Sequence, residues 1–129
     1  MKTRLLVLFS LLVVVALVLS ACGGAASAPA SSAKAKGDAT KGKTVFTTTC
    51  SACHGADAKG LPGLGKDMTT STFIKGLNDD DFLAFLKTGR PASDPKNTTK
   101  VDMPPKGGNP ALTDQDLYDV IAYIRTVNK

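Results

Sequence analysis

Hydrophobic side chains recur at helical spacing near the C-terminus. Four apolar residues share one face of an α-helix at positions i, i+3, i+4 and i+7: Leu117, Val120, Ile121 and Ile124. Thr113, ahead of them, is a favoured N-cap residue, and Arg125 near the far end suits the negative end of the helix dipole. The pattern predicts an amphipathic helix that begins after Thr113 and runs toward the C-terminus.

Two earlier segments carry the same kind of signal. One helix is predicted to begin near Asp38 and to run into the cysteine pair that starts at Cys50, with apolar residues at three- and four-residue spacing. A second is predicted from Asn78, an N-cap type, to Gly89, because a glycine commonly ends a helix.

The stretches between these helices, 55–65 and 91–110, are rich in Gly and Pro and show neither a helical period nor strand alternation. No run of the sequence requires a strand. We therefore expect an all-α domain over residues 38–129, in which long loops connect the helices.

The first 21 residues differ in character from this domain. A basic start at 1–4 precedes an apolar run at 5–19, as in the n-region and h-region of a signal peptide. The run is shorter than the ~20 residues of an ordinary membrane-spanning helix. The alternative, a retained anchor helix, is disfavoured because a processing site follows: Leu-Ser-Ala-Cys at 19–22 resembles the bacterial lipobox, in which the cysteine receives a diacylglycerol.

Residues 23–37 are all small or polar and cannot pack a core. Such a linker has a root-mean-square reach of roughly 20 Å. The sequence thus predicts a lipoprotein signal peptide at 1–21, a lipid-attached flexible linker at 22–37 and a folded domain at 38–129. Cys22 would anchor an exported protein on the extracytoplasmic face of a membrane.

The charge balance argues against one class of partner. Removal of the signal peptide would leave 14 of the 16 basic residues, against 11 acidic ones. A surplus this small and scattered does not indicate nucleic-acid binding, although it can bias docking toward an acidic protein surface.

The sequence from Cys50 to His54 reads C-x-x-C-H, the attachment motif for c-type haem. On a helix, residues three and four apart share a face, so Cys50 meets both Cys53 and His54. Two thiols on that face can form thioethers to the haem vinyl groups while the imidazole reaches the iron. We therefore expect one covalent haem c, attached through Cys50 and Cys53 and ligated by His54.

Other functions of Cys50, Cys53 and His54 fit the sequence less well than haem attachment. A thioredoxin-type dithiol would need a strand before it, and a structural zinc site needs four ligands where this part of the chain offers three. A plain disulfide, which export favours, would leave His54 unexplained. The disulfide and the redox dithiol are the alternatives to haem attachment.

The sequence also limits the second axial ligand. His54 is the only histidine, which excludes bis-histidine ligation and a second C-x-x-C-H haem. Met68 follows it by 14 residues, at the end of the loop expected to wrap the proximal side. Met103 follows by 49 residues, enough to reach the opposite haem face, and Pro104 stiffens the chain just after it. We expect Met103 to ligate the iron and Met68 to pack; a buried gap-filling role is the alternative for Met103.

With these motifs in place, residues 38–129 resemble the class I cytochromes c. The matching features are Gly42 and Phe46 before the C-x-x-C-H motif, GLPGLG at 60–65, LKTGRP at 86–91, MPP at 103–105, and LTD at 112–114 leading to YIR at 123–125. The resemblance implies a cytochrome c fold, in which the N- and C-terminal helices cross beside the haem and long loops wrap it. It also implies a close approach at Gly42, with Tyr123 as the aromatic partner.

One position departs from the family pattern. Many relatives have Gly-Pro-x-Leu where this chain has GKDM at 65–68, so Lys66 replaces the proline whose carbonyl often accepts the second N–H of the histidine. We expect the bond to persist, because every residue has a carbonyl. A softer loop there would affect the tuning of the iron more than its ligation.

This ligand set favours electron transfer. A thioether ligand raises the reduction potential and leaves no open iron position, so we expect a one-electron carrier and not an enzyme. The alternative is a haem enzyme or sensor, a peroxidase or gas-binding protein, which would need an open site. Small lipoprotein cytochromes similar to this one serve as tethered shuttles or as subunits of membrane respiratory or photosynthetic complexes, so the expected partners are donor and acceptor redox proteins.

Two further expectations concern the surface and the core. Four lysines near the predicted haem loops form either a docking ring or an ordinary solvated surface: Lys59, Lys66, Lys100 and Lys106. A domain of about 90 residues is marginal by itself, so the haem would supply missing apolar volume, and the apoprotein should be largely unfolded.

Overall fold

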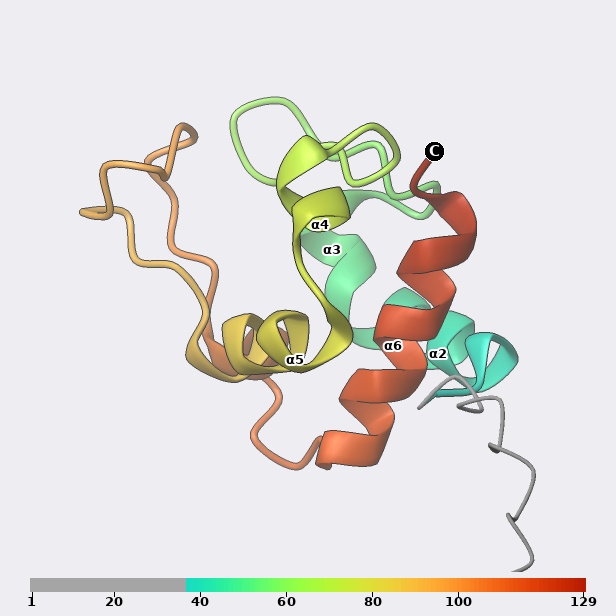
Figure 1. The fold of residues 1–129 in the computed structure, drawn as a ribbon. Coiled ribbons are helices and arrows are strands. Elements are labelled where there is room, and N and C mark those ends of the chain that lie inside the picture. The colour runs from blue at the N-terminus through green and yellow to red at the C-terminus, as the bar shows by residue number, and fades with distance from the viewer. Residues whose placement is uncertain (1–36) are drawn as a thin grey trace, which may run out of the picture. The chain divides into compact units, whose positions relative to one another are not determined.

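The computed structural model describes residues 37–129. The signal peptide, the lipid site at Cys22 and most of the linker, all expected from the sequence, lie outside this range. Within it the chain forms helices and long loops (Figure 1). The α-helices are α2 (Ala39–Val45), α3 (Ser51–His54), α4 (Thr72–Gly76), α5 (Asp79–Thr88) and α6 (Asp114–Val127), and a short 3-10 helix spans Pro105–Gly108.

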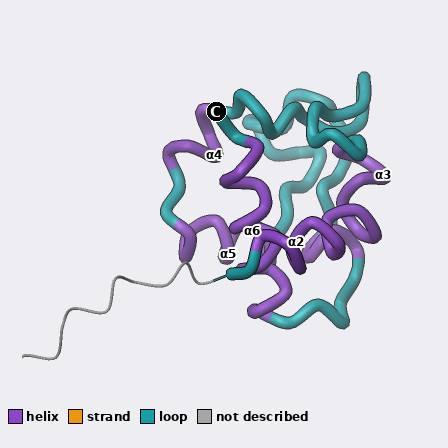
Figure 2. Tube along the Cα trace, turned by 90° about the vertical axis from the view of Figure 1, so that its right-hand side faces the viewer, coloured by secondary structure: helices purple, strands orange, loops and turns teal. Residues whose placement is uncertain are grey.

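No extended strand occurs in the described range, where Figure 2 shows helix and loop alone. The only strand-like pairings there are two isolated bridges, between Leu61 and Gly65 and between Arg90 and Met103. The all-α prediction is therefore confirmed. None of the helices in residues 37–129 is long and apolar enough to cross a membrane.

Helix α6 begins where its sequence predicts. The Asp116 N–H donates to the Thr113 hydroxyl at 3.2 Å, and the Thr113 N–H donates to the Asp116 carboxylate at 2.8 Å. This reciprocal capping box satisfies two backbone donors at the helix start. The bonds from the Thr113 hydroxyl and then from its N–H hold the pKa of Asp116 below its ordinary value.

The predicted N-terminal helix is also present, with one feature that the periodicity did not indicate. The Asp38 carboxylate caps α2 by accepting from the Thr40 N–H at 2.8 Å. The chain then widens into a π-helical turn, Phe46–Cys50, before α3 continues to His54. Such turns insert extra backbone into a helix and often lie beside functional sites. Here the turn ends at the first cysteine of the motif.

The remaining helices lie in the middle of the chain. Helix α5 is confirmed between Asn78, whose side chain accepts from the Asp81 N–H at 2.8 Å, and Gly89, which ends it at φ 70°. Helix α4 was not predicted. A single turn capped by Ser71 is too short to show a hydrophobic period.

Helices α2 and α6 cross in direct contact, as the family resemblance implied (Figure 1). A Cβ on Gly42 would lie 1.8 Å from the Asp119 carbonyl oxygen, so only glycine permits this approach. The Phe46 and Tyr123 rings pack beside it with centroids 5.2 Å apart. The Asp38 N–H donates to the buried Asp119 carboxylate at 2.8 Å, which joins the start of α2 to α6.

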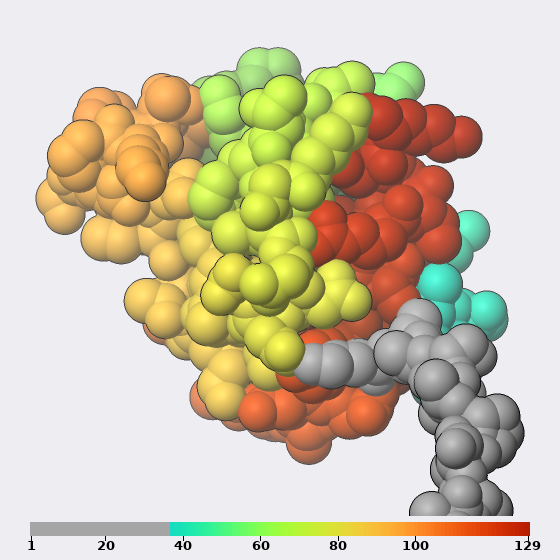
Figure 3. All heavy atoms as spheres, viewed as in Figure 1, coloured from blue at the N-terminus to red at the C-terminus, as the bar shows by residue number. Residues whose placement is uncertain are grey.

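The C-terminal helix also fixes the loop that precedes α5. Arg125 donates to the carbonyls of Ile74, at 2.7 Å, and Leu77. The Asn128 amide donates to the Met68 carbonyl at 2.6 Å. Residues between α3 and α5 are therefore held against α6, while residues 90–103 lie on the side away from α6 (orange in Figure 3).

Candidate haem-binding site

A cavity of about 880 Å³ lies between the helices and the two long loops. All four haem residues expected from the sequence in this domain line it: Cys50, Cys53, His54 and Met103. The cavity is large for a domain of this size and lies within the usual range for cofactor sites. The structure thus brings together residues that are up to 53 positions apart.

The cysteines lie on one wall, at the junction of the π-helical turn and α3. Both are half-buried free thiols, so the structure does not join them in a disulfide. Burial, and then the neighbouring Cys53, raises the pKa of the Cys50 thiol to about 11. Cys50 is therefore a neutral thiol in this apolar setting, without the lowered pKa that marks a reactive redox dithiol.

His54 is oriented by the loop opposite it. Its Nδ1 lies 3.1 Å from the Lys66 carbonyl oxygen. A carbonyl can only accept, so Nδ1 carries the proton and Nε2 keeps its lone pair. Burial lowers the pKa of His54, against a smaller opposite effect of the bond to Lys66, and so favours the neutral ring that a metal requires. The bond expected despite the replaced proline is present.

Met103 comes from a loop after α5, residues 90–103, which we call the methionine loop. The backbones of Arg90 and Met103 pair at its base, with N–H to carbonyl distances of 2.8 and 2.9 Å in the two directions. The Met103 side chain is half-buried and packs against the core. Its backbone is therefore fixed by α5 through Arg90, independently of the loop that orients His54.

Met68 also lines the cavity but is bound differently. Its side chain is 6% exposed and belongs to the hydrophobic core. Its N–H donates to the Ala58 carbonyl at 2.8 Å, inside the loop that follows His54. Met68 thus belongs to the same loop as Lys66, as we expected from its place in the sequence.

The cavity lining fits a haem. Much of it is apolar, contributed by α5, α6 and the loops: Leu61, Phe82, Phe85, Leu86, Val120 and Ile124. Two thiols and an imidazole lie on one wall and a thioether comes from another segment, which is the donor set that c-type attachment and ligation need. No side chain fills this volume, so it is available to a haem, and the instability of the apoprotein stays a prediction.

Two polar residues of the site were not predicted. The Arg90 guanidinium stacks on the Phe73 and Phe85 rings, 4.7 and 4.9 Å from their centroids, and pairs with Asp94 at 3.4 Å. Asn97 is buried inside the methionine loop. Arg90 lies within the family motif at 86–91 and could have been singled out, whereas no local pattern marks Asn97.

Comparisons with known proteins agree with this geometry. Residues 39–128 match the model of the cytochrome c family. This chain is a cytochrome c. It is 33% identical over 87 residues to cytochrome c-555 of Prosthecochloris aestuarii, an alignment that covers 67% of this chain and 85% of that protein. Cytochrome c-555 of Chlorobaculum thiosulfatiphilum is also 33% identical, over 88 residues that cover 67% of this chain and 93% of the relative.

A third relative is larger. The CcoP subunit of the cbb3-type cytochrome c oxidase of Rhodobacter capsulatus is 29% identical over 90 residues, which cover 69% of this chain and 29% of that subunit. No solved structure matches the chain.

Membership of the cytochrome c family, with the Cys50 and Cys53 pair in place, establishes one covalent haem c and an electron carrier. The expected all-α cytochrome c fold, with its terminal helices in contact, is confirmed.

The structure alters the picture of the four lysines. The Lys106 ammonium donates to the carbonyls of Leu112, at 2.7 Å, and Pro110, at 3.3 Å, so part of its charge is engaged within the chain. Lys59 lies 3.9 Å from Asp57. Lys66 is exposed at the cavity edge, whereas Lys100 is exposed but does not line the cavity. Lys96, which was not among the four predicted lysines, is also exposed at the cavity edge.

Proposed function

We propose that this cytochrome c carries single electrons at a membrane surface, with His54 and Met103 as the two axial ligands of its haem iron. The observation that carries the proposal is the cavity that both residues line, in which the Nδ1 of His54 is committed to the Lys66 carbonyl. The second ring nitrogen is then the ligand atom. When bound, the haem supplies a one-electron iron couple whose potential a thioether ligand raises.

The choice of Met103 over Met68 rests on where each backbone is attached. Met68 is bonded to the loop that follows His54, through Ala58, and to α6 through Asn128. Met103 is bonded to Arg90, at the end of α5. A methionine fixed to the histidine's own loop is poorly placed to ligate from the opposite face, whereas the methionine loop approaches from a different part of the fold.

The protein's own residues would keep the site closed. The cysteines hold the haem in place, the Lys66 carbonyl fixes the orientation of His54, and the apolar side chains of α5 and α6 exclude water. With both axial positions filled by side chains, no position is left for a substrate. This arrangement suits electron transfer, in which the surroundings of the iron change little between the two oxidation states.

The partner-facing surface is proposed to be the cavity rim. Three large apolar side chains on the rim are 38–41% exposed and come from separate segments: Leu61, Phe73 and Val101. Lys66 and Lys96 lie at the same edge. The cavity lining carries five basic side chains against two acidic ones, Asp67 and Asp102. An apolar contact beside this basic excess fits a redox protein whose docking face carries acidic residues.

The attachment to a membrane is likewise a proposal. Cytochromes c are typically extracytoplasmic, and the 1–21 segment with the lipobox at Cys22 would export the chain and anchor it by a lipid. The linker predicted at 22–37 would let the domain reach partners within the same membrane. Similarity to an oxidase subunit makes a membrane respiratory complex a reasonable partner, with the chain as shuttle or bound subunit.

Two measurements on the haem-loaded domain test the closed-site carrier. A redox titration should follow a single one-electron transition. Carbon monoxide added to the reduced protein should leave the absorption spectrum unchanged, because both axial positions are taken. Rapid carbon monoxide binding by the unaltered protein would instead indicate an open iron position, as in a haem enzyme or gas sensor.

A further inference from the structure

Asn97 is a buried polar residue in a loop whose other residues are exposed or half-buried. Among the described residues, the buried polar or charged side chains are Asn97, at 6% exposure, and Asp119, which joins α2 to α6. Burial of an amide costs free energy unless its donors and acceptor are bonded. The bonds that Asn97 makes therefore show what the residue does in the methionine loop.

The amide nitrogen of Asn97 joins the two arms of the loop. It donates to the Val101 carbonyl at 2.7 Å on the returning arm and to the Pro91 carbonyl at 3.1 Å on the outgoing arm. The Arg90 carbonyl lies 3.5 Å away, at the limit of a hydrogen bond. One side chain thus links the first residues of the loop to the residues just before Met103.

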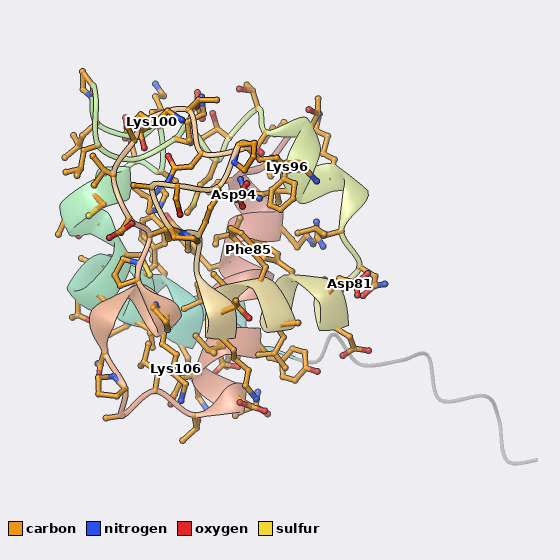
Figure 4. All side chains as sticks on the ribbon, turned by 90° about the vertical axis from the view of Figure 1, so that its left-hand side faces the viewer. Asp81, Phe85, Asp94, Lys96, Lys100 and Lys106 are labelled. Carbon is orange, nitrogen blue, oxygen red and sulfur yellow. The ribbon has the colours of Figure 1, made fainter. Side chains whose placement is uncertain are left out.

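The amide oxygen fixes the tip. It accepts from the Lys100 N–H at 3.0 Å and from the Thr99 N–H and hydroxyl at 3.2 and 3.1 Å. Lys100 has a φ of 60°, a left-handed conformation that costs free energy for a residue with a side chain. The bond to Asn97 stabilises that turn, which reverses the chain toward Met103. Figure 4 shows Asp94, Lys96 and Lys100 along this loop.

The same network reaches the backbone of Met103. The Arg90 carbonyl accepts from the Met103 N–H at 2.9 Å and is the third, distant acceptor of Asn97. Val101, the closest acceptor, lies two residues before Met103. At the base the fit is tight, since a Cβ on Gly89, at φ 70°, would lie 2.2 Å from the Met103 carbonyl oxygen. Between this base and the Asn97 amide, both arms of the loop are held.

We propose that Asn97 is a positioning residue for Met103: it ties the arms of the methionine loop together and so keeps the thioether directed at the haem site. The inference rests on the proposed function, in which Met103 ligates the iron. Without the amide, the loop would open more often and the thioether would leave the iron for a larger fraction of the time.

Imidazole titration of the oxidised, haem-loaded protein measures that fraction. An added ligand competes only when Met103 is displaced, so its apparent affinity is the intrinsic affinity reduced by the open fraction. Met103→Ala supplies the intrinsic affinity. The apparent imidazole affinity of Asn97→Ala should be about tenfold or more above that of the parent. Truncation leaves buried polar groups of the loop without partners, and the free energy that this costs corresponds to a fold-change of that size.

Two further variants separate positioning from general stability. Asn128→Ala is the matched control: its amide also crosslinks backbone segments, through the Met68 and Ser71 carbonyls, but outside the methionine loop. It should lower the melting temperature and leave imidazole affinity unchanged. Thr99→Val keeps the side-chain shape but removes one donor to Asn97, together with a long bond of 3.5 Å that the hydroxyl accepts from the Val101 N–H, and should raise the affinity about threefold. Thr99→Val tests the positioning role of Asn97 if Asn97→Ala does not accumulate with haem.

The outcomes are distinguishable. If Met103→Ala binds imidazole no better than the parent, Met103 is not the ligand and the proposed ligation fails. If Met103→Ala binds tightly but Asn97→Ala, or Thr99→Val in its place, behaves like Asn128→Ala, the ligation stands and the role of Asn97 is refuted.

Discussion

Replacement of Gly42 by alanine tests the helix crossing on which the site is built. The new Cβ would lie 1.8 Å from the Asp119 carbonyl oxygen, whereas ordinary contacts begin at 3.4 Å. Helices α2 and α6 would have to separate by about 1.6 Å, and gaps of this size remove most of the dispersion attraction across a packed seam.

The overpacking penalty of Gly42→Ala is partly offset by the higher helix propensity of alanine. Overpacking a well-packed interface costs about 1 to 3 kcal/mol, and this contact lies at the severe end because the obstacle is backbone. The separation would also weaken the contact between the Phe46 and Tyr123 rings and the bond from Asp38 to Asp119. Alanine regains up to about 1 kcal/mol of helix propensity. A net loss of about 2 kcal/mol corresponds to a fall in melting temperature of roughly 8 to 16 °C for a domain of this length.

The assay is thermal unfolding of the haem-loaded protein, followed by far-ultraviolet circular dichroism and by haem absorption. Gly76→Ala is the matched control, because Gly76 is a helical glycine and a Cβ added there would have no atom within 4 Å. The control should melt at or slightly above the parent temperature. A Gly42→Ala protein as stable as the parent would show that the helices do not pack through Gly42.

Three other changes test separate parts of the account. Cys22→Ser should release the protein from membranes into the soluble fraction without altering its haem spectrum, because Cys22 lies outside the haem domain predicted at 38–129; a variant that stayed membrane-bound at high salt would point to a retained anchor helix. Rising ionic strength should slow electron exchange with an acidic partner, since exposed charges are screened beyond about 10 Å at 0.1 M; a constant rate would favour a pre-assembled subunit. Asp116 has a lowered pKa in the folded state, so its contribution to stability is present above its ordinary pKa of 3.8 and is lost as the pH falls through the lower folded value. Asp116→Asn should therefore melt earlier than the parent near neutral pH and lose less stability on acidification, and parallel melting curves across the acid range would contradict the capping role.

Local signals explain why much of the fold was predictable. Helix α6 has its cap, its acidic first turn and its apolar face within one stretch of sequence, and α5 is bounded by Asn78 and Gly89 in the same way. Helix α4 was missed because one turn carries no period. The π-helical turn that ends at Cys50 was missed because its hydrogen-bond pattern, in which the Ser51 N–H donates to the Phe46 carbonyl, leaves no mark in the spacing of residues.

The residues of the site likewise differ in how far local sequence identifies them. The C-x-x-C-H motif is a local pattern, and the structure places its three residues on one cavity wall. The Lys66 carbonyl could be anticipated only from the family pattern, because any residue supplies one. Asn97 acts through partners on both arms of a loop, and such a network depends on how the loop closes, which the spacing of residues does not encode.

The most direct test of the proposed ligation compares Met103→Ala with Met68→Ala in the haem-loaded protein. We predict that Met103→Ala keeps its covalently held haem, loses the methionine-to-iron absorption band of the oxidised state, shows a lower reduction potential and gains carbon monoxide binding when reduced. Met68→Ala should retain that band and lose about 2 to 5 kcal/mol of stability, as expected for truncating a buried side chain. Loss of the band in Met68→Ala together with its retention in Met103→Ala would contradict the account and assign the ligand to Met68.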